Sequence, residues 1–253
     1  MDFIYGAGTE PVMTLENEAM ETVRDMNDRS RRQTRKYYEA YDDRYRTAHA
    51  LGVSWAGEVS TPIVMQTLLK YQISKERRIL EIGCGEGRDA RVVLESGCDL
   101  LATDVSDEAI AYCKKQMPQY ANCFSVMDCL ADRLDASFDF IYAVAVIHML
   151  VPDADRNGFY HFICEHLTPE GIALICTMGD GQIESRSDIS TAFTLQERDH
   201  ESGRMMVAGT SCRMVSFQTF EQELARSGLR CIEKGITASP PDFNSLMYAV
   251  VSR

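Results

Sequence analysis

The sequence has 253 residues, of which 45% are hydrophobic and 25% are charged, so its length suits one large α/β domain with an appendage or at most two small domains. The 38 acidic residues outnumber the 26 basic ones and give a formal net charge of −12. Because nucleic-acid binding depends on Lys and Arg side chains that neutralise phosphates, this balance argues against a DNA or RNA partner.

No apolar run approaches the roughly 20 residues that cross a bilayer. The first residues, MDFIYGAGTEPVM, lack the basic start and apolar core of a secretory signal. Nine cysteines show no C-x-x-C pair, which suits free thiols in a reducing compartment. We therefore expect a cytoplasmic protein with no membrane partner, and no metal site because no Cys/His set has ligand spacing.

The N-terminal part is charge-dense over residues 12–46, with scattered Met, Leu and Tyr, which indicates one or two surface helices. Thr61 followed by Pro62 is typical of a helix start and predicts a helix to about Tyr71. We expect residues 1–60 to form an N-terminal helical extension or lid. Residues 61–253 then form the main domain.

From residue 78 onward, short apolar segments alternate with segments of helical character. The predicted strands cover residues 79–82, 100–103, 123–127, 138–144 and 171–178. The predicted helices cover residues 89–95, 107–116 and 153–166, and Ser106 is a good cap for the second of them. Strands that are apolar on both faces and separated by helices indicate a mostly parallel sheet covered on both sides.

A polar insertion, residues 179–214, follows the fifth predicted strand and has the length of a binding loop. A helix near residues 217–227 and strands near 229–236 and 246–251 complete the chain. The segment between these two strands is short and contains Pro240. It therefore predicts an antiparallel pair, since a parallel return needs a longer crossover.

The segment RILEIGCGEGRDA places Gly83, Gly85 and Gly87 between a predicted strand and a predicted helix. A P-loop would carry Lys and then Ser or Thr after its glycines, but Arg88 follows here. Arg88 also occupies the third small position of the dinucleotide fingerprint G-x-G-x-x-G. The glycines still let the backbone approach a ligand closely, and the helix start behind them favours an anion such as a carboxylate.

Two acidic residues follow the next predicted strands. Asp104 ends the second strand, 17 positions after Gly87, where a carboxylate can accept both hydroxyls of an unphosphorylated ribose. Val105 beside it can lie against a purine face, and Asp128 after the third strand can accept from an adenine amino group. A helix-capping role for Asp104 and a plain turn role for Asp128 are the alternatives.

Five ordered motifs, LEIGCGEG, TDVS, MDCL, FDFIYAVAVIHML and LTPEGIALICTMG, resemble those of the class I S-adenosylmethionine-dependent methyltransferases over roughly residues 60–180. The resemblance implies a Rossmann-like α/β fold with a seven-stranded, mostly parallel sheet, an antiparallel last strand and helices on both faces. It also implies S-adenosyl-L-methionine as cofactor. By match, the cofactor-binding residues are Glu81, Gly83, Cys84, Gly85, Gly87, Asp104, Val105, Asp128, Cys129 and Ala143.

His148 lies in AVAVIHML, the segment that faces the cofactor's methyl group in this fold. Methyl transfer from a sulfonium mainly requires an acceptor lone pair in line with the S–CH₃ bond. A hydroxyl, thiol or ammonium acceptor also requires a base, and His148 can serve as one. Apolar residues surround His148, so packing under the cofactor is the favoured alternative.

Two regions remain for acceptor recognition. The stretch YYEAYDDRYRTAHALGVSWAG carries Tyr45 and Trp55 and is expected to form a lid. The insertion carries Glu197, His200 and Arg213 as polar candidates, although each is more often solvated than functional. An Arg213 buried near the methyl group would indicate an anionic acceptor.

The sequence therefore predicts a methyltransferase that acts on a small molecule, as a monomer or homodimer, with no nucleic-acid partner. No Asn- or Asp-Pro-Pro-aromatic motif follows the fourth strand, which argues further against methylation of bases. A protein side-chain methyltransferase, a non-catalytic S-adenosylmethionine-binding module and a nicotinamide dehydrogenase are the alternatives. Whether O, N or S is methylated stays open.

Overall fold

The structure is a computed structural model that describes residues 35–57, 59–238 and 245–253. The chain divides into two units, Met1–Lys36 and Tyr37–Arg253, and the fold described below is that of the second unit. Of residues 12–46, where one or two surface helices are expected, residues 12–34 lie outside the described residues.

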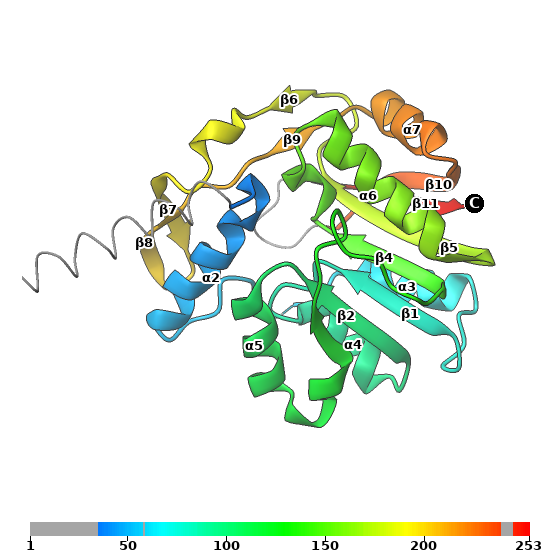
Figure 1. Cartoon of the computed structure of the whole chain (residues 1–253), viewed down its shortest axis with the longest axis horizontal. Coiled ribbons are helices and arrows are strands. Elements are labelled where there is room, and N and C mark those ends of the chain that lie inside the picture. The colour runs from blue at the N-terminus through cyan, green and yellow to red at the C-terminus, as the bar shows by residue number, and fades with distance from the viewer. Residues whose placement is uncertain (1–34, 58, 239–244) are drawn as a thin grey trace, which may run out of the picture. The chain divides into compact units, whose positions relative to one another are not determined.

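A seven-stranded sheet forms the centre of this unit (Figure 1). Its order is β10-β11-β5-β4-β1-β2-β3, and the strands from β5 to β3 are all parallel. β11 is antiparallel to both β5 and β10, so the predicted sheet with a reversed last strand is confirmed. The bounds are β1 (Arg78–Ile82), β2 (Asp99–Asp104), β3 (Phe124–Val126), β4 (Phe138–Val144), β5 (Leu167–Met178), β10 (Arg230–Thr237) and β11 (Leu246–Ser252).

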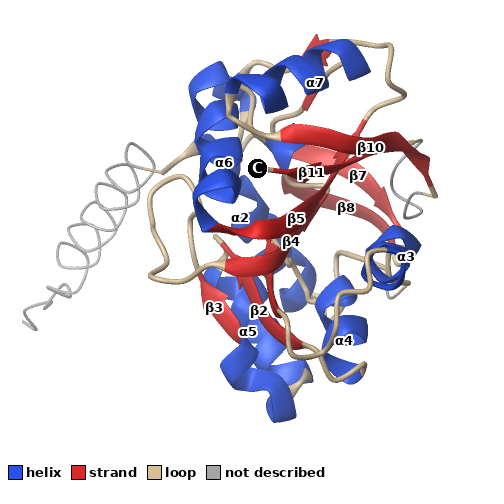
Figure 2. Ribbon diagram, turned by 90° about the vertical axis from the view of Figure 1, so that its right-hand side faces the viewer, coloured by secondary structure: helices blue, strands red, loops and turns tan. Residues whose placement is uncertain are grey.

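Helices cover both faces of the sheet (Figure 2). One face carries α3 (Pro62–Lys70), α4 (Arg88–Glu95) and α5 (Asp107–Gln116), and the other carries α6 (Asp153–His166) and α7 (Phe217–Arg226). Two successive residues of β1 show why both faces of this strand need apolar side chains. Ile79 packs in the α4-side core and Leu80 in the α6-side core.

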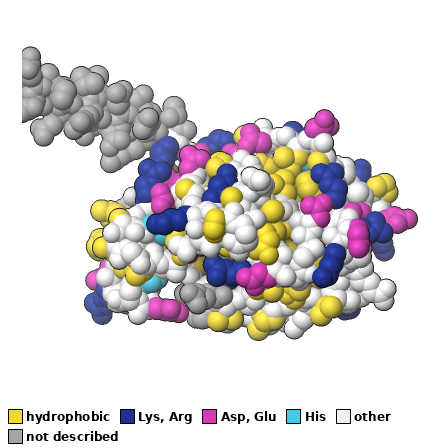
Figure 3. Space-filling model, turned by 90° about the horizontal axis from the view of Figure 1, so that it is seen from below, with side chains coloured by type: hydrophobic (Ala, Val, Ile, Leu, Met, Phe, Trp, Pro, Cys, Tyr) yellow, Lys and Arg dark blue, Asp and Glu magenta, His cyan; other side chains and the backbone are white. Residues whose placement is uncertain are grey.

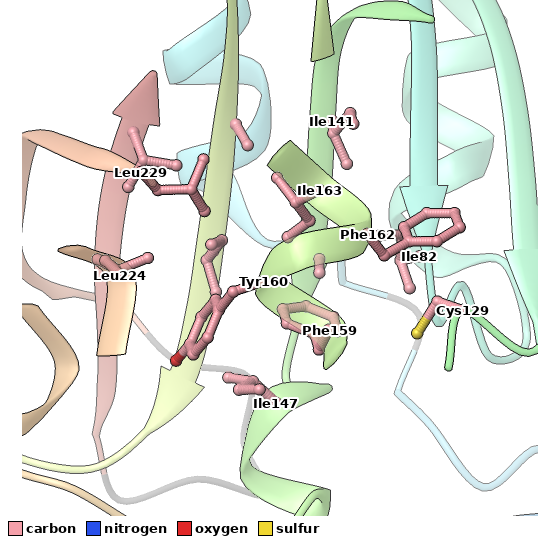
Figure 4. Close-up of a cluster of buried hydrophobic side chains, with 14 of the residues drawn as sticks. Ile82, Cys129, Ile141, Ile147, Phe159, Tyr160, Phe162, Ile163, Leu224 and Leu229 are labelled. Atoms are coloured by element: carbon pink, nitrogen blue, oxygen red, sulfur yellow. The ribbon is translucent and has the colours of Figure 1, made fainter. Parts of the chain in front are cut away.

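Side chains of α6 pack in the α6-side core against residues of the strands and of α7 (Figure 4). Four of them are 0% exposed: Phe159, Tyr160, Phe162 and Ile163. Burying an apolar side chain of this size stabilises the fold by roughly 1.5–3 kcal/mol. This core therefore fixes α6, and with it the segment between β4 and α6, against the sheet.

The predicted elements agree with the structure within a few residues. β5 begins earlier than expected, at Leu167, directly after α6, and its pairing with β4 shifts register near Phe138. Ser106 accepts from Ala109 N at 3.0 Å, as a helix cap should. The Thr61 hydroxyl does not cap α3, because it bonds elsewhere. Two 3₁₀ turns complete this part: η2 (Pro118–Cys123) and η3 (Ile147–Met149).

The insertion forms short strands, which the sequence analysis did not predict. β7 (Leu195–His200) and β8 (Gly203–Ala208) make an antiparallel hairpin, and β6 (Ser185–Arg186) pairs with β9 (Arg213–Met214). A further 3₁₀ turn, η4 (Ile189–Thr191), precedes the hairpin. The strand β7, with sequence LQERDH, lacks the apolar alternation on which a strand prediction depends.

The start of the second unit packs on this hairpin. It comprises η1 (Tyr37–Glu39) and α2 (Ala40–Ala50). Ala48 of α2 lies in a small core with Met205 and Val207 of β8. Segments far apart in the sequence therefore form one layer, at the left of Figure 1.

Candidate active site

The glycine loop, residues 83–87, joins β1 to α4. Its glycines have φ angles of 73° at Gly83, 52° at Gly85 and 79° at Gly87, in the left-handed region that side chains disfavour. Space is also short, because a Cβ atom on Gly85 would lie 2.7 Å from Tyr45 Oη. Glycine is therefore required both for the bend and for the approach of Tyr45.

Asp104, the last residue of β2, bonds directly to this loop. Its Oδ2 accepts from Gly85 N at 2.8 Å and its Oδ1 from Ser106 N at 2.9 Å, while Cys84 N donates to Thr103 O at 2.8 Å. Burial raises the pKa of the Asp104 carboxyl, against the effect of the two N–H donors. Asp104 therefore lies beside the loop, as predicted, and in addition holds the loop's shape.

Asp128 lies at the same edge of the sheet. Asp104 is in register with Val126, and Met127 N donates to Asp104 O at 2.9 Å, so Asp128 follows one residue later. Its Oδ2 accepts from Tyr38 Oη at 2.9 Å. Both carboxylates therefore lie at the edge where the parallel strands end, and Asp104 bonds to the glycine loop that begins there.

Three other residues of the predicted cofactor set differ in accessibility. Val105 is half-buried directly after β2. Cys129 is buried in the α6-side core, where burial raises the pKa of its thiol to about 12. Ala143, inside β4, is 1% exposed and packs in the same core, so its side chain has only apolar neighbours there.

A buried polar cluster lies at the start of α4. Glu81 of β1 is 2% exposed and accepts from Tyr142 Oη at 3.0 Å; burial, and next Asp89, raise its pKa well above the usual range. Asp89 accepts from Thr61 N at 2.5 Å, from Thr61 Oγ1 at 3.0 Å and from Arg88 Nη2 at 3.3 Å. The cluster ties the start of α3 to the end of the glycine loop.

His148 lies in the 3₁₀ turn η3, directly after β4, and is 2% exposed. Burial, and next Arg156, lower its pKa to about 4. The imidazole is therefore neutral at pH 7. Since a base next to a buried guanidinium gains a proton with difficulty, these surroundings favour the packing role of His148 over the role of base.

Residues 37–57, here called the lid segment, bond to the glycine loop through Glu86. Its Oε1 accepts from Trp55 N at 2.8 Å and its Oε2 from Ala56 N at 2.6 Å. His49 Nε2 lies 2.8 Å from Oε1. The glycine loop therefore holds both α2 and the chain that follows it.

Asp42 of α2 bonds to the start of α5. Its Oδ1 accepts from Ser106 Oγ at 2.7 Å and from Glu108 N at 3.2 Å. Glu108 Oε1 also lies 2.7 Å from His49 Nδ1. The lid segment is thus fixed to the region after β2 as well.

Tyr37 extends these contacts to the segment after β4. Its Oη accepts from Val151 N at 3.1 Å and donates to Asp155 Oδ2 at 2.7 Å. Together with the bond from Tyr38 to Asp128, the lid segment reaches four loops at this edge: the glycine loop and those after β2, β3 and β4.

The residues expected to bind the acceptor fall into separate places. Trp55 and His200 stack with ring centroids 5.5 Å apart, and His200 Nε2 lies 2.9 Å from Ser54 O. Tyr45, 8% exposed, lies over Gly85 instead. The structure therefore joins Trp55 to His200, and joins Tyr45 to the glycine loop.

Arg213 bonds to acids and a carbonyl of the α6 region. Its Nη1 donates to Val151 O at 2.7 Å and to Asp153 Oδ1 at 2.6 Å, and its Nη2 lies 3.6 Å from Glu223 Oε1. The charge of Arg213 is therefore already compensated. Glu197, the other polar candidate of the insertion, is exposed.

Several residues around this edge were not predicted from the sequence: Tyr38, Asp42, Arg44, His49 and Glu86. A signal for the helix was present, because Tyr41, Tyr45 and His49 recur at intervals of four residues, which places them on one helical face. The dense charges of this segment favoured a solvated helix instead.

Comparison with known proteins identifies the fold. Residues 80–173 match the family model described as a methyltransferase domain, and no curated protein matches the chain. The CcbJ methyltransferase from Streptomyces caelestis is similar with a TM-score of 0.62 and 13% identity over 85% of this chain and 97% of that one. An S-adenosylmethionine-dependent methyltransferase from Clostridium acetobutylicum ATCC 824 has a TM-score of 0.58 and 12% identity over 92% and 98%. The glycopeptide N-methyltransferase MtfA has a TM-score of 0.56 and 17% identity over 79% and 96%.

At these identities the solved structures establish the fold, and the family model adds the type of domain. The seven-stranded sheet with its antiparallel β11 agrees with this fold. The chain therefore has the class I methyltransferase fold, and its residues 80–173 match the methyltransferase-domain family.

Proposed function

We propose that this chain is an enzyme that transfers the methyl group of S-adenosylmethionine to a small-molecule acceptor. The acceptor is held beneath the lid segment and the insertion. The observation that carries the proposal is the set of contacts from residues 37–57 to the glycine loop and to the loops after β2, β3 and β4, at the carboxyl edge of the parallel strands, here called the cofactor edge. Small-molecule sites bury most of their ligand, and an edge covered in this way suits such a ligand better than a side chain on a folded protein. MtfA, which shares the fold, is described as acting on a glycopeptide.

The cofactor contacts in this proposal follow the positions of the acids. Asp104 binds the ribose hydroxyls, Asp128 accepts from the adenine amino group, and the glycine loop faces the methionine part. S-adenosylmethionine supplies an electrophilic methyl group on a sulfonium. The carboxylates Glu86, Asp104 and Asp128 give this edge negative charge, which favours a cationic cofactor.

The chain's own contribution to catalysis is then mainly positioning. Arg156 donates to Ile147 O at 2.9 Å and to Leu150 O at 3.3 Å, which fixes the segment around His148. A fixed segment and a closed lid hold the acceptor in line with the S–CH₃ bond and exclude water. His148, neutral and buried, packs below the cofactor.

Residues 37–57, which belong to the expected N-terminal extension, have the role of the lid in this proposal.

The compartment and the partners are the other parts of the proposed function. All nine cysteines are free, which supports a reducing compartment such as the cytoplasm. None of the helices in the described part of the chain has the length and apolarity of a membrane span. Figure 3 shows basic and acidic side chains interspersed on the face seen from below, which gives no support to a nucleic-acid partner.

Calorimetry with S-adenosylhomocysteine, together with an assay for its formation from S-adenosylmethionine and a panel of small amines, phenols and thiols, tests this function. Asp104→Asn should weaken S-adenosylhomocysteine binding at least roughly tenfold, because it turns a carboxylate oxygen into a donor facing N–H groups. Asp99→Asn, at the exposed start of the same strand, is the matched control. Unchanged binding by Asp104→Asn would remove the ribose assignment, and turnover with proteins alone would favour the side-chain methyltransferase.

A further inference from the structure

Arg44 of α2 is a buried cation whose partners are all neutral. It is 5% exposed. Its Nε and Nη2 donate to Ala208 O at 3.2 and 2.8 Å, and Nη2 also donates to Thr210 Oγ1 at 3.2 Å. Within residues 37–57, 59–238 and 245–253, no carboxylate forms an ion pair with this guanidinium.

Arg156 is a buried guanidinium with a structural role, and a carboxylate pairs with it. It is 0% exposed, and Glu223 accepts from its Nε at 2.8 Å and from its Nη2 at 2.6 Å. Buried charges in proteins are usually paired in this way. Arg44 therefore departs from the pattern within the same protein.

A second positively charged side chain, Arg198, lies near Arg44. Burial lowers the pKa of Arg44, and Arg198 of β7 lowers it further. Arg198 is in register with Met205, whose side chain lies in the small core beneath the hairpin. A second cation thus lies near Arg44, although the edge below is acidic.

Three sets of contacts join Arg44 to the cofactor edge. Trp55, whose ring centroid lies 4.7 Å from Arg44 Cζ, bonds through its backbone to Glu86 of the glycine loop. The Tyr41 ring also lies 4.7 Å from Arg44 Cζ and is next to Tyr45, which covers Gly85.

The third set runs through the insertion. Thr210 accepts from Arg44, and the next residue, Ser211, donates to Met149 O at 2.8 Å in the segment after β4. Arg44 is therefore joined on one side to the glycine loop and on the other to the segment that faces the methyl group. Both elements that hold it, the lid segment and the insertion, are those expected to enclose the acceptor.

We propose that Arg44 recognises an anionic group, such as a carboxylate, on the acceptor molecule, with Tyr41 and Trp55 flanking the bound group. The inference rests on the proposed small-molecule function and names the class of its substrate. A guanidinium presents a planar set of N–H donors that matches a carboxylate. The anion would supply the charge that the protein leaves out.

The carboxylate of the cofactor itself is the competing source of negative charge. The glycine loop and the start of α4, with Arg88 beside it, are expected to face that group. Arg44 instead donates to Ala208 O and Thr210 Oγ1 of the insertion, which is one of the two elements expected to enclose the acceptor. The acceptor is therefore the source to which the proposal commits.

The test measures binding of matched acids and amides to the wild-type enzyme saturated with S-adenosylhomocysteine. Two pairs serve as probes: benzoate with benzamide, and hexanoate with hexanamide. At least one acid should bind roughly tenfold or more tightly than its amide, as expected for a charge-assisted contact. Equal binding of acids and amides, or no binding of any probe at about 10 mM, overturns the proposal.

Variants then assign the preference to Arg44. Arg44→Gln should abolish the acid preference, and Arg44→Lys should keep part of it. Arg204 is an exposed arginine of the β7–β8 hairpin on which α2 packs, so Arg204→Gln should leave the preference intact. A preference that survives Arg44→Gln overturns the proposal.

The cofactor arm separates the two sources of charge. Arg44→Gln should bind S-adenosylhomocysteine and methylthioadenosine, which lacks the amino-acid tail, as the wild type does. Loss of affinity for S-adenosylhomocysteine alone would show that Arg44 binds the cofactor's carboxylate and would overturn the assignment. Failure of the wild type to bind either compound would instead contradict the proposed cofactor site.

Discussion

His49 Nε2 lies 2.8 Å from Glu86 Oε1, while its Nδ1 lies 2.7 Å from Glu108 Oε1. Both ring nitrogens are thus within hydrogen-bond distance of a carboxylate oxygen, and the two carboxylates belong to different elements. The ring also stacks on Tyr112, with centroids 4.4 Å apart. One side chain of α2 therefore joins the glycine loop to the start of α5.

His49→Ala should make dissociation of S-adenosylhomocysteine faster by roughly tenfold, because it removes two hydrogen bonds to charged groups that hold α2 over the cofactor edge. Stopped-flow displacement of the bound product measures the rate. His161→Ala, at an exposed position of α6, is the control. If both variants release the product at the wild-type rate, opening of α2 does not limit exchange.

Gly85→Ala should abolish tight cofactor binding and lower the thermal stability. The new Cβ atom would lie 2.7 Å from Tyr45 Oη, and the backbone φ of 52° disfavours a side chain. Calorimetry and thermal unfolding measure the two effects. Adding Tyr45→Phe should restore part of both, because it removes the oxygen that the methyl group meets.

Gly52→Ala separates backbone strain from this collision. Its φ is 77°, but no atom lies within 4 Å of the added Cβ position. It should cost only about 1 kcal/mol in stability and leave cofactor binding unchanged. Equal losses at both glycines, or no rescue by Tyr45→Phe, would mean that the contact with Tyr45 is unimportant.

The lowered pKa of His148 should make the folded protein less stable at mildly acidic pH. Its pKa is about 4 in the folded protein against 6.5 in the unfolded chain, so the unfolded chain binds more protons as the pH falls below 6.5. The free energy of unfolding should fall between pH 6.5 and pH 4 by up to about 3 kcal/mol from this residue. Urea unfolding of wild type and His148→Asn at several pH values isolates the effect; parallel curves would exclude it.

The fold and the cofactor edge were predictable because each rests on a local pattern. Strands that are apolar on both faces predict a sheet covered on both sides, and glycines after such a strand predict a bend at its end. Asp104 and Asp128 then follow from the rule that parallel strands end at one edge. The place of both residues at this edge, and the proximity of Asp104 to Gly85, needed no knowledge of distant contacts.

The cover over this edge was not predictable in the same way. Arg44 is buried only because α2 meets the insertion, whose strand β8 lies more than 150 residues away in the sequence. Its neighbours in the sequence are charged, and charge density indicates exposure. Likewise Arg213 was a candidate for an anionic acceptor until the structure placed it against Asp153 and Glu223.

Glu223→Gln should destabilise the protein by about 3–5 kcal/mol, because the guanidinium of Arg156 would stay buried without its bidentate partner. Turnover should fall as well, since Arg156 holds the carbonyls of the segment around His148. Glu221→Gln on the same helix is the matched control: Glu221 pairs with Lys234 at the surface, where such pairs contribute at most about 1 kcal/mol. Urea unfolding gives both values, and a cost for Glu223→Gln as small as that for Glu221→Gln would mean that Arg156 does not depend on the carboxylate.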